Sequence, residues 1–318
     1  MTDLPDEVLA HLRSVLDSPE IPGDRYLPLE AIAQGGMGTI YRTHDRTLDR
    51  EVALKVLRAE LSGDILAERL RREARILARL EHPGIVPVHD AGMLADGRVF
   101  YVMKLVRGQR LDEFASHATR NDVLRAFLRV CEAVGFAHAE GVVHRDLKPA
   151  NVMVGAFGEV LVLDWGIARL VREGRERAGG ESAVPRETVA DDTSSGTVLG
   201  TFGFMAPEQA AGAVDRVDGR SDVYSLGAVL RQLIGPAPPR PLASICDRAS
   251  AQLREERYPD VAELAAEVTR YLDGVPVQAH RESPLERVGR AYLKYQTPII
   301  LVLSYLAMRM LFLLWRDR

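Results

Sequence analysis

The chain has 318 residues, which is enough for two domains or for one domain with two lobes. Hydrophobic residues make up 47% and charged residues 27%, the ordinary composition of a globular protein. The formal net charge of −4 gives no electrostatic sign of nucleic-acid binding, so we expect no nucleic-acid partner. The first ten residues lack the basic start and apolar core of a signal peptide. Cys131 and Cys246 have no motif spacing, which predicts reduced thiols in a cytosolic environment.

The start of the chain changes from helical to β character. Residues 1–25 carry a short helical pattern closed by prolines, and we treat them as an N-terminal extension without an assigned function. From residue 26 the β signal leads into the glycine-rich run QGGMGTIY at 34–41. Glycines let the backbone turn tightly and approach phosphate oxygens. The run continues into β-favouring residues and has no Gly-Lys-Thr/Ser ending, which excludes a dinucleotide-binding turn and a Walker A loop.

The next elements alternate between strand and helix. Residues 51–57 have the pattern of a strand, and residues 64–80 repeat leucine and alanine at steps of three and four, as an amphipathic helix does. The run at 99–103 predicts a buried strand. A helical pattern then extends over 111–140, so a β-rich part is followed by a helical part.

A polar segment beside two short apolar runs carries the strongest chemical signal. Residues 141–166 read GVVHRDLKPANVMVGAFGEVLVLDWG, and the apolar runs predict a β-hairpin. Asp146 precedes the first strand, Asn151 lies at its entry and Asp164 follows the second strand. Such a hairpin brings together groups that handle protons or metal ions. A plain polar surface loop beside a hairpin is the alternative interpretation.

The rest of the chain is less regular. Residues 170–195 are too polar to bury much apolar surface, so the sequence predicts no order there. The run GTFGFMAPE follows at 200–208, and Asp222 opens a predicted buried helix. A proline-rich run at 235–241 then leads straight to one predicted helix at 242–254.

The runs HRDLKPAN and DWG together resemble the catalytic loop and the metal-binding motif of the protein-kinase family. Trp165 stands where the family usually has Phe. The resemblance covers about residues 26–273 and is closest to bacterial Hanks-type serine/threonine kinases. It implies an α+β, two-lobed protein-kinase fold, with a small β lobe and one helix over 26–105 and a larger helical lobe over 109–273.

The resemblance implies a role for each polar side chain of this segment. Phosphoryl transfer depends on positioning and charge neutralisation. The proton acceptor would be Asp146, and Lys148 would reach the transferring phosphate as a cation. Asn151 and Asp164 would hold Mg²⁺, which prefers hard oxygen ligands. The implied cofactors are ATP and Mg²⁺, and the implied acceptors are Ser and Thr hydroxyls of protein substrates.

The small lobe would hold the nucleotide. Lys55, in the sequence VALK, resembles the phosphate-binding lysine of the family, and Glu73 resembles the glutamate that pairs with it. Glu68 is the competing acid on the same predicted helix. Met103 would lie at the back of the adenine pocket, and the backbone of residues 104–106 would pair with the adenine edge. The other expected contacts to ATP are Ile32, Ala33, Gly35, Gly36, Gly38, Ile40, Ala53 and Leu105.

The residues between DWG and APE correspond to the activation segment of the family. Thr201, in the run before APE, supports Ser/Thr rather than Tyr specificity. Arg145 would pair with a phosphate in this segment and so order it. We expect autophosphorylation between Thr188 and Thr201, with Thr193 and Thr197 as the main candidates and Ser195 as a further one.

The resemblance also implies two structural contacts and one shortened or missing helix. Arg257 resembles the arginine that pairs with Glu208, and Asp222 would brace the backbone of the catalytic loop. The abbreviated stretch at 235–241 indicates that a helix often used for substrate docking is shortened or missing.

Two other functions are consistent with the same fold. A membrane-anchored pseudokinase, acting as a nucleotide-binding or scaffolding module, is supported by Ala33 in place of a loop glycine, by Trp165 and by the short docking region. Against it, Lys55, Glu73, Asp146, Asn151 and Asp164 are all present. A small-molecule phosphotransferase would not need the run before APE.

The end of the chain predicts a membrane anchor. Residues 274–296 form a basic segment, and residues 297–315 read TPIILVLSYLAMRMLFLLW. As a helix the second segment would span about 28 Å, close to a bilayer core of about 30 Å. Arg309 costs about 2.5–3.5 kcal/mol on the insertion scale, but it can snorkel, and the Leu, Ile, Val and Phe residues contribute roughly −3 to −6 kcal/mol. We therefore predict a single-pass transmembrane helix with the kinase domain in the cytoplasm. A buried core helix and an amphipathic surface helix are the alternatives, and a homodimer is left open.

Overall fold

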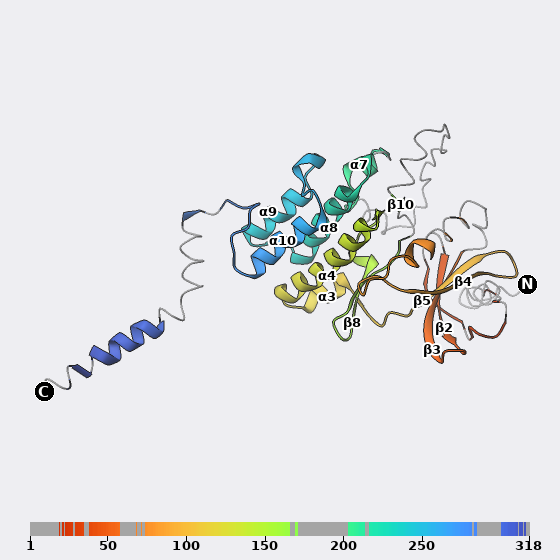
Figure 1. Ribbon diagram of the computed structural model, residues 1–318, viewed down its shortest axis with the longest axis horizontal. Helices are drawn as coiled ribbons and strands as arrows, with labels where there is room; N and C mark the ends of the chain where they lie inside the picture. The colour runs from red at the N-terminus through yellow and green to blue at the C-terminus, as the bar shows by residue number, and fades with distance from the viewer. Residues whose placement is uncertain are drawn as a thin grey trace, which may run out of the picture.

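A computed structural model shows a β-rich lobe and a helical lobe side by side (Figure 1). It describes residues 19, 21, 23–27, 29–34, 38–57, 68, 71, 74–165, 169–170, 203–213, 216–281, 283–284, 300–310, 312–313 and 315. The two-lobed α+β fold expected from the sequence is confirmed. The described cysteines are both free and buried in the large lobe.

The small lobe is an antiparallel sheet with the strand order β1-β2-β3-β5-β4. Its strands are β1 (Glu30–Gln34), β2 (Gly38–Asp45), β3 (Arg50–Leu57), β4 (Val88–Met93) and β5 (Val99–Lys104). Successive side chains of a strand face opposite sides of a sheet. In β3 this places Val52, Leu54 and Val56 in an apolar cluster with Phe100, while Lys55 belongs to the opposite face.

The helix predicted at 64–80 is described in part. Residues 68, 71 and 74–77 are helical, and the side chains of Ile76, Leu77 and Leu80 are buried in the main core. In the described residues 74–80, the apolar side chains therefore pack inward, as the periodicity indicates.

Helices build the large lobe. They are α3 (Leu111–His117), α4 (Arg120–Ala139), α7 (Pro207–Ala210), α8 (Gly219–Ile234), α9 (Arg240–Ala249) and α10 (Val261–Leu272). Two helices replace the continuous pattern expected over 111–140. The break occurs because Thr119 takes an extended backbone and its hydroxyl accepts the N–H of Asp122, which caps the start of α4.

Short elements complete this lobe and carry the loop with the candidate site residues. They are β6 (Gly108–Arg110), β7 (Val142–Val143), η2 (Pro149–Asn151), β8 (Val152–Gly155), β9 (Val160–Val162), β10 (Arg169–Leu170) and η4 (Arg254–Glu256). The predicted hairpin is confirmed, because β8 and β9 pair antiparallel with Val152 opposite Val162.

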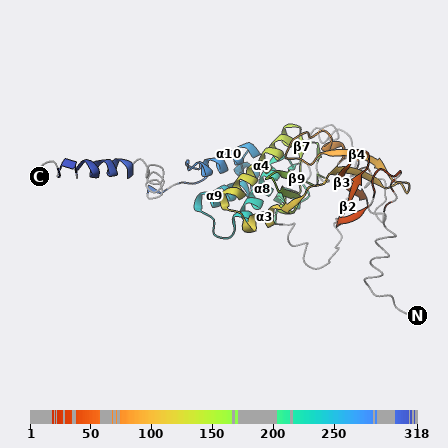
Figure 2. The ribbon, with the colours of Figure 1, turned by 90° about the horizontal axis from the view of Figure 1, so that it is seen from below.

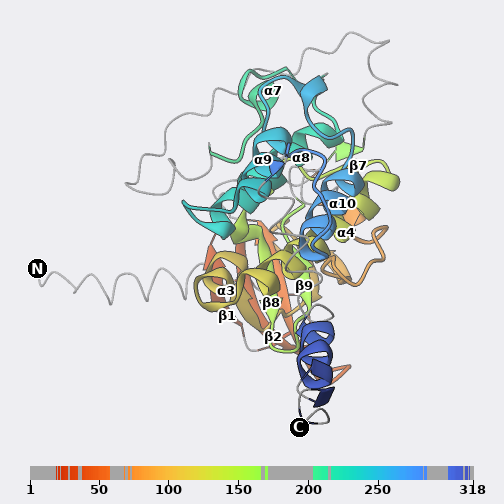
Figure 3. The ribbon, with the colours of Figure 1, turned by 90° about the vertical axis from the view of Figure 1, so that its left-hand side faces the viewer.

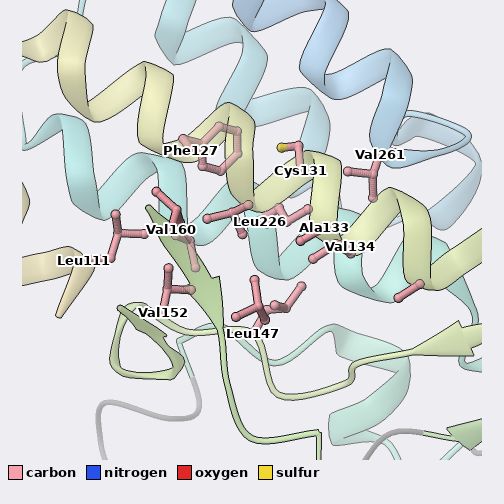
Figure 4. Close-up of a cluster of buried hydrophobic side chains, with 14 of the residues drawn as sticks. Leu111, Phe127, Cys131, Ala133, Val134, Leu147, Val152, Val160, Leu226 and Val261 are labelled. Atoms are coloured by element: carbon pink, nitrogen blue, oxygen red, sulfur yellow. The ribbon is translucent and has the colours of Figure 1, made fainter. Parts of the chain in front are cut away.

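The main core lies directly beneath the loop that precedes β8. Helix α4 contacts α8 and α10, and α8 contacts α9 (Figure 3). Leu147 and Val152 belong to the same cluster as Phe127 of α4 and Leu226 of α8 (Figure 4). Each such buried side chain stabilises the fold by about 1.5–3 kcal/mol relative to exposure. The loop therefore rests on closely packed helices and is held in place.

The connection between α8 and α9 is short. Helix α8 ends at Ile234 and α9 begins at Arg240, so no further helix lies between them, as the sequence indicates. The helix predicted at 242–254 begins earlier and ends at Ala249, and η4 follows it. The backbone turns at Gly235, whose φ of +79° is a conformation that glycine adopts without strain.

The segment that follows α10 is attached to the large lobe. The buried Glu267 accepts hydrogen bonds from the backbone N–H groups of Gln278 (3.2 Å) and Ala279 (2.8 Å), and Val277 is buried. Further on, residues 300–310, 312–313 and 315 are helical and stand clear of both lobes (Figures 1 and 2). Among the described residues, no helix is both long enough and apolar enough to cross a bilayer.

Candidate active site

Asp146 is held by two side chains of its own loop. The Lys148 Nζ donates to Asp146 Oδ2 at 2.8 Å, and the Asn151 Nδ2 donates to the same oxygen at 3.1 Å and to the Asp146 carbonyl at 2.8 Å. Both side-chain contacts use Oδ2, and no described residue donates to Oδ1. The loop thus presents one carboxylate oxygen that remains able to accept a proton.

Asp164 links the two lobes. The Lys55 Nζ, from β3 of the small lobe, donates to Asp164 Oδ1 at 3.0 Å. Although burial acts to raise the pKa of Asp164, the charge and hydrogen bond of Lys55 hold that pKa below its usual value. Asp164 also has a φ of +59°, unusual for a residue other than glycine. The site therefore keeps this carboxylate ionised and beside a cation.

The His144 and Trp165 rings pack against each other, each near one of these two aspartates along the chain. The Asp146 N–H donates to His144 Nδ1 at 3.2 Å, so Nε2 carries the proton and donates to the Leu163 carbonyl at 3.1 Å. The Trp165 ring is fully buried, with its centroid 4.6 Å from that of His144. Its Nε1 donates to the Val162 carbonyl at 3.3 Å. The site therefore accommodates an indole where the family usually has a phenyl ring.

Asp222, at the start of α8, braces the backbone of the loop that carries Asp146, as expected. Its Oδ1 accepts the Arg145 N–H at 2.8 Å, and its Oδ2 accepts the His144 N–H at 2.8 Å and a contact from His138 Nε2 at 2.7 Å. Burial acts to raise the pKa of Asp222, but the hydrogen bond and charge of His138 outweigh it and lower the pKa. The sequence did not indicate the role of His138.

Glu208 and Arg257 form the expected buried pair. The Arg257 guanidinium donates to Glu208 Oε1 at 2.8 Å and Oε2 at 2.9 Å, and the Ser221 hydroxyl donates to Oε1 at 2.6 Å. Burial acts to raise the pKa of Glu208, yet the hydrogen bonds of Arg257 and Ser221 lower it to about 2. The pair fixes α7 against the start of α8.

The expected nucleotide contacts that the structure describes lie on adjoining strands. Ala53 pairs in register with Met103, and Ile40 lies opposite Lys55. Ala33 pairs with Ile40 across β1 and β2. Three more of the expected nucleotide contacts are described. Ile32 lies in the exposed strand β1, Gly38 starts β2, and Leu105 follows the end of β5.

Several expected residues lie outside the described part of the chain: Gly35, Gly36, Glu73, Thr193, Ser195, Thr197 and Thr201. The competing acid Glu68 is described. Its carboxylate is exposed and pairs with Arg75 at 3.0 Å and with Arg71 at 3.7 Å. A described acidic partner of Lys55 is Asp164, at 3.0 Å.

The structure combines a small β lobe with a helical lobe, and Lys55 pairs with Asp164. Close by is the loop that carries Asp146, Lys148 and Asn151. This arrangement defines the class of protein kinases. The chain belongs to the protein kinase domain family, whose model matches residues 26–274.

Several bacterial serine/threonine kinases are similar to the chain. The chain is 31% identical to the serine/threonine-protein kinase PknD of Protochlamydia amoebophila over 80% of its length and 30% of that protein. It is 36% identical to the serine/threonine-protein kinase PknB of Mycobacterium tuberculosis over 87% of its length and 42% of that protein. The chain therefore spans less than half the length of these relatives. The kinase domain of Mycobacterium tuberculosis PknI has the same fold, with a TM-score of 0.57, 24% identity and coverage of 80% of this chain and 98% of that domain.

Proposed function

We propose that the chain, through a kinase domain at residues 26–273, transfers the γ-phosphoryl group of ATP to Ser and Thr hydroxyls of proteins. The observation that carries the proposal is the arrangement around Asp146. Lys148 and Asn151 hold one of its carboxylate oxygens at 2.8 and 3.1 Å, and this leaves the other oxygen for the acceptor hydroxyl. Similarity to serine/threonine-protein kinases over most of the chain supports the same reaction.

Each side chain of the site has a task in this reaction. Asp146 Oδ1 accepts the proton of the attacking hydroxyl, which orients the nucleophile. Lys148 is 2.8 Å from the other oxygen and supplies positive charge beside the transferred group. Lys55, a buried residue of β3, positions the phosphates of the nucleotide. The apolar surface of Ala53 and Met103 lies on adjacent strands and would contact the adenine.

The donor set fits Mg²⁺. Mg²⁺ is held in proteins by one or two carboxylates, with water and phosphate oxygens completing its shell. Asp164 supplies an ionised carboxylate. The Asn151 amide nitrogen donates to Asp146, and no described residue donates to the Asn151 amide oxygen. Among the described residues no group of three or more His, Cys, Asp or Glu side chains forms a dedicated metal cage. The bound ion would neutralise phosphate charge as it shifts during transfer.

Autophosphorylation of the segment before APE would regulate the enzyme. Arg145 lies directly before Asp146, at the point where its backbone is held by Asp222. A phosphate on Thr193, Ser195 or Thr197 would add negative charge that this guanidinium can bind. The predicted Ser/Thr preference, expected from Thr201, belongs to the same proposal.

The C-terminal segment would anchor the kinase in a membrane, with its catalytic domain in the cytoplasm. The large apolar side chains at the described helical positions 300–310, 312–313 and 315 are exposed, from 40% for Leu313 to 76% for Trp315. Water is a poor solvent for such an all-round apolar helix, and a bilayer covers all its faces. Washing membranes with carbonate would release the chain if this helix only lies on the surface.

A homodimer remains a prediction.

The kinase assignment is tested with labelled ATP. Purified chain is incubated with γ-labelled ATP, with and without Mg²⁺, and the products are mapped by mass spectrometry. Mg²⁺-dependent label on Ser or Thr is expected, and Lys55→Met should abolish it through lost phosphate positioning. Nucleotide binding without any transfer would instead favour the pseudokinase alternative.

A further inference from the structure

We propose that Gln209 is a positioning residue for the catalytic loop, and this role rests on the proposed function of Asp146. Gln209 lies in α7, which is outside that loop, and its Nε2 donates to the Arg145 carbonyl at 2.9 Å. That carbonyl belongs to the peptide bond that leads directly into Asp146. Neither the composition nor the motif spacing of the sequence indicates this contact.

The peptide needs such support because its backbone is strained. Arg145 has a φ of +71°, a left-handed conformation that costs a residue other than glycine roughly 1–2 kcal/mol. Strained backbone persists where the surrounding structure determines it. Among the described residues, two side chains from outside the loop contribute to this support. Asp222 accepts the Arg145 N–H at 2.8 Å, and Gln209 donates to the Arg145 carbonyl.

Gln209 is well placed to act as a fixed support. The preceding residue, Glu208, is held by the buried Arg257 through two hydrogen bonds of 2.8 and 2.9 Å, so α7 is anchored to the large lobe. The amide of Gln209 has a second contact, because its Oε1 accepts the Ala206 N–H at 3.3 Å and caps α7. One side chain therefore connects the helix of the APE run to the backbone of the catalytic loop.

Loss of the contact should act on the chemical step. Without Gln209, the Arg145 carbonyl loses this donor, and the peptide is able to rotate toward an unstrained conformation. Rotation of this peptide would change the direction of the Asp146 carboxylate. Displacements of about 1 Å in a reacting group are sufficient to lower rates by about a hundredfold. The nucleotide contacts of the small lobe do not include α7, so affinity for ATP should change little.

The two contacts of Gln209 can be separated by substitution. Gln209→Glu keeps an oxygen that accepts the Ala206 N–H but replaces the donor to Arg145. Gln209→Met has a similar length and removes both contacts. Gln232→Glu, at an exposed position of α8, introduces the same change of charge away from the loop and serves as the control. Steady-state kinetics of the full chain with ATP and a Ser/Thr peptide mixture, Mg·ADP titration and thermal unfolding are measured for each.

The expected result is a fall in kcat of about tenfold for Gln209→Glu and Gln209→Met, comparable to the loss of one hydrogen bond. In both variants, the KM for ATP and the affinity for Mg·ADP should stay within about twofold of the wild-type values. The melting temperature of Gln209→Glu should stay near that of the wild type. The control Gln232→Glu should match the wild type in every measurement.

Three outcomes would overturn the role of Gln209 in an active enzyme. They are a wild-type kcat in Gln209→Glu, a change confined to the KM for ATP, and a loss of activity that only follows a loss of thermal stability. A wild-type chain that binds nucleotide but transfers no phosphate would overturn the proposed function and this role together.

Discussion

Replacing Arg257 by Leu should destabilise the large lobe strongly. Its guanidinium is fully buried and donates to both oxygens of Glu208, and it also donates to the carbonyls of Arg220, Ala251 and Gln252 at 2.8–3.2 Å. Leu retains part of the apolar stem but none of these donors. The Glu208 carboxylate would then stay buried with the Ser221 hydroxyl as its remaining side-chain donor among the described residues.

Removal of one partner from a buried ion pair costs about 3–5 kcal/mol. For a domain of this size, each kcal/mol lowers the melting temperature by about 2–4 °C, so Arg257→Leu should melt about 6–20 °C lower. Arg231→Leu is the matched control. Arg231 pairs with Asp247 at 2.7 Å on the surface, and exposed pairs contribute about 1 kcal/mol or less.

The assay is thermal unfolding of the full chain by circular dichroism at neutral pH. The double variant Arg257→Leu/Glu208→Gln should recover part of the loss, because it removes the unpaired charge. A melting temperature of Arg257→Leu within about 2 °C of the wild type would refute the argument that this pair anchors α7. Equal losses for Arg257→Leu and Arg231→Leu would also contradict it.

Three further outcomes are expected. The pKa of Glu208 is about 2 in the folded chain, against a usual value of 4.5, and this difference stabilises the fold by about 3 kcal/mol above pH 4.5. The contribution is lost as the pH falls from 4.5 through 2. In acid unfolding curves, Glu208→Gln should therefore lose less stability over that pH range than the wild type. Trp165→Ala should cost about 3–5 kcal/mol of unfolding free energy in denaturant titrations, because it empties a fully buried site, and Trp165→Phe should cost less. Mass spectrometry of active chain should find phosphate between Thr188 and Thr201, and its complete absence there would contradict regulation through Arg145.

Local patterns in the sequence were sufficient for much of the fold. Two short apolar runs predicted the β8–β9 hairpin, and the proline-rich run before α9 predicted the short connection after α8. The break between α3 and α4 was missed, although its signal was present: Thr119 with an acid three residues later is the pattern of a helix start. Hydrophobic periodicity over 111–140 outweighed that short signal.

Contacts between distant residues explain what the sequence did not reveal. The pair of Lys55 and Asp164 joins positions 109 residues apart, and the Gln209 contact to Arg145 joins positions 64 residues apart. Each depends on how elements pack in space, so spacing along the chain carries no trace of it. The pairing of Glu208 with Arg257 was predictable because a family resemblance, rather than a local pattern, indicated it.

The most direct test of phosphoryl transfer uses Asp146. Full chain, Asp146→Asn and the surface control Asp247→Asn are compared for transfer of label from γ-labelled ATP and for binding of Mg·ATP. Asn keeps the shape of the side chain but cannot accept the hydroxyl proton, so Asp146→Asn should bind nucleotide normally and lose nearly all transfer, while Asp247→Asn should match the wild type. Full transfer activity in Asp146→Asn would contradict the assignment of this loop as the catalytic centre.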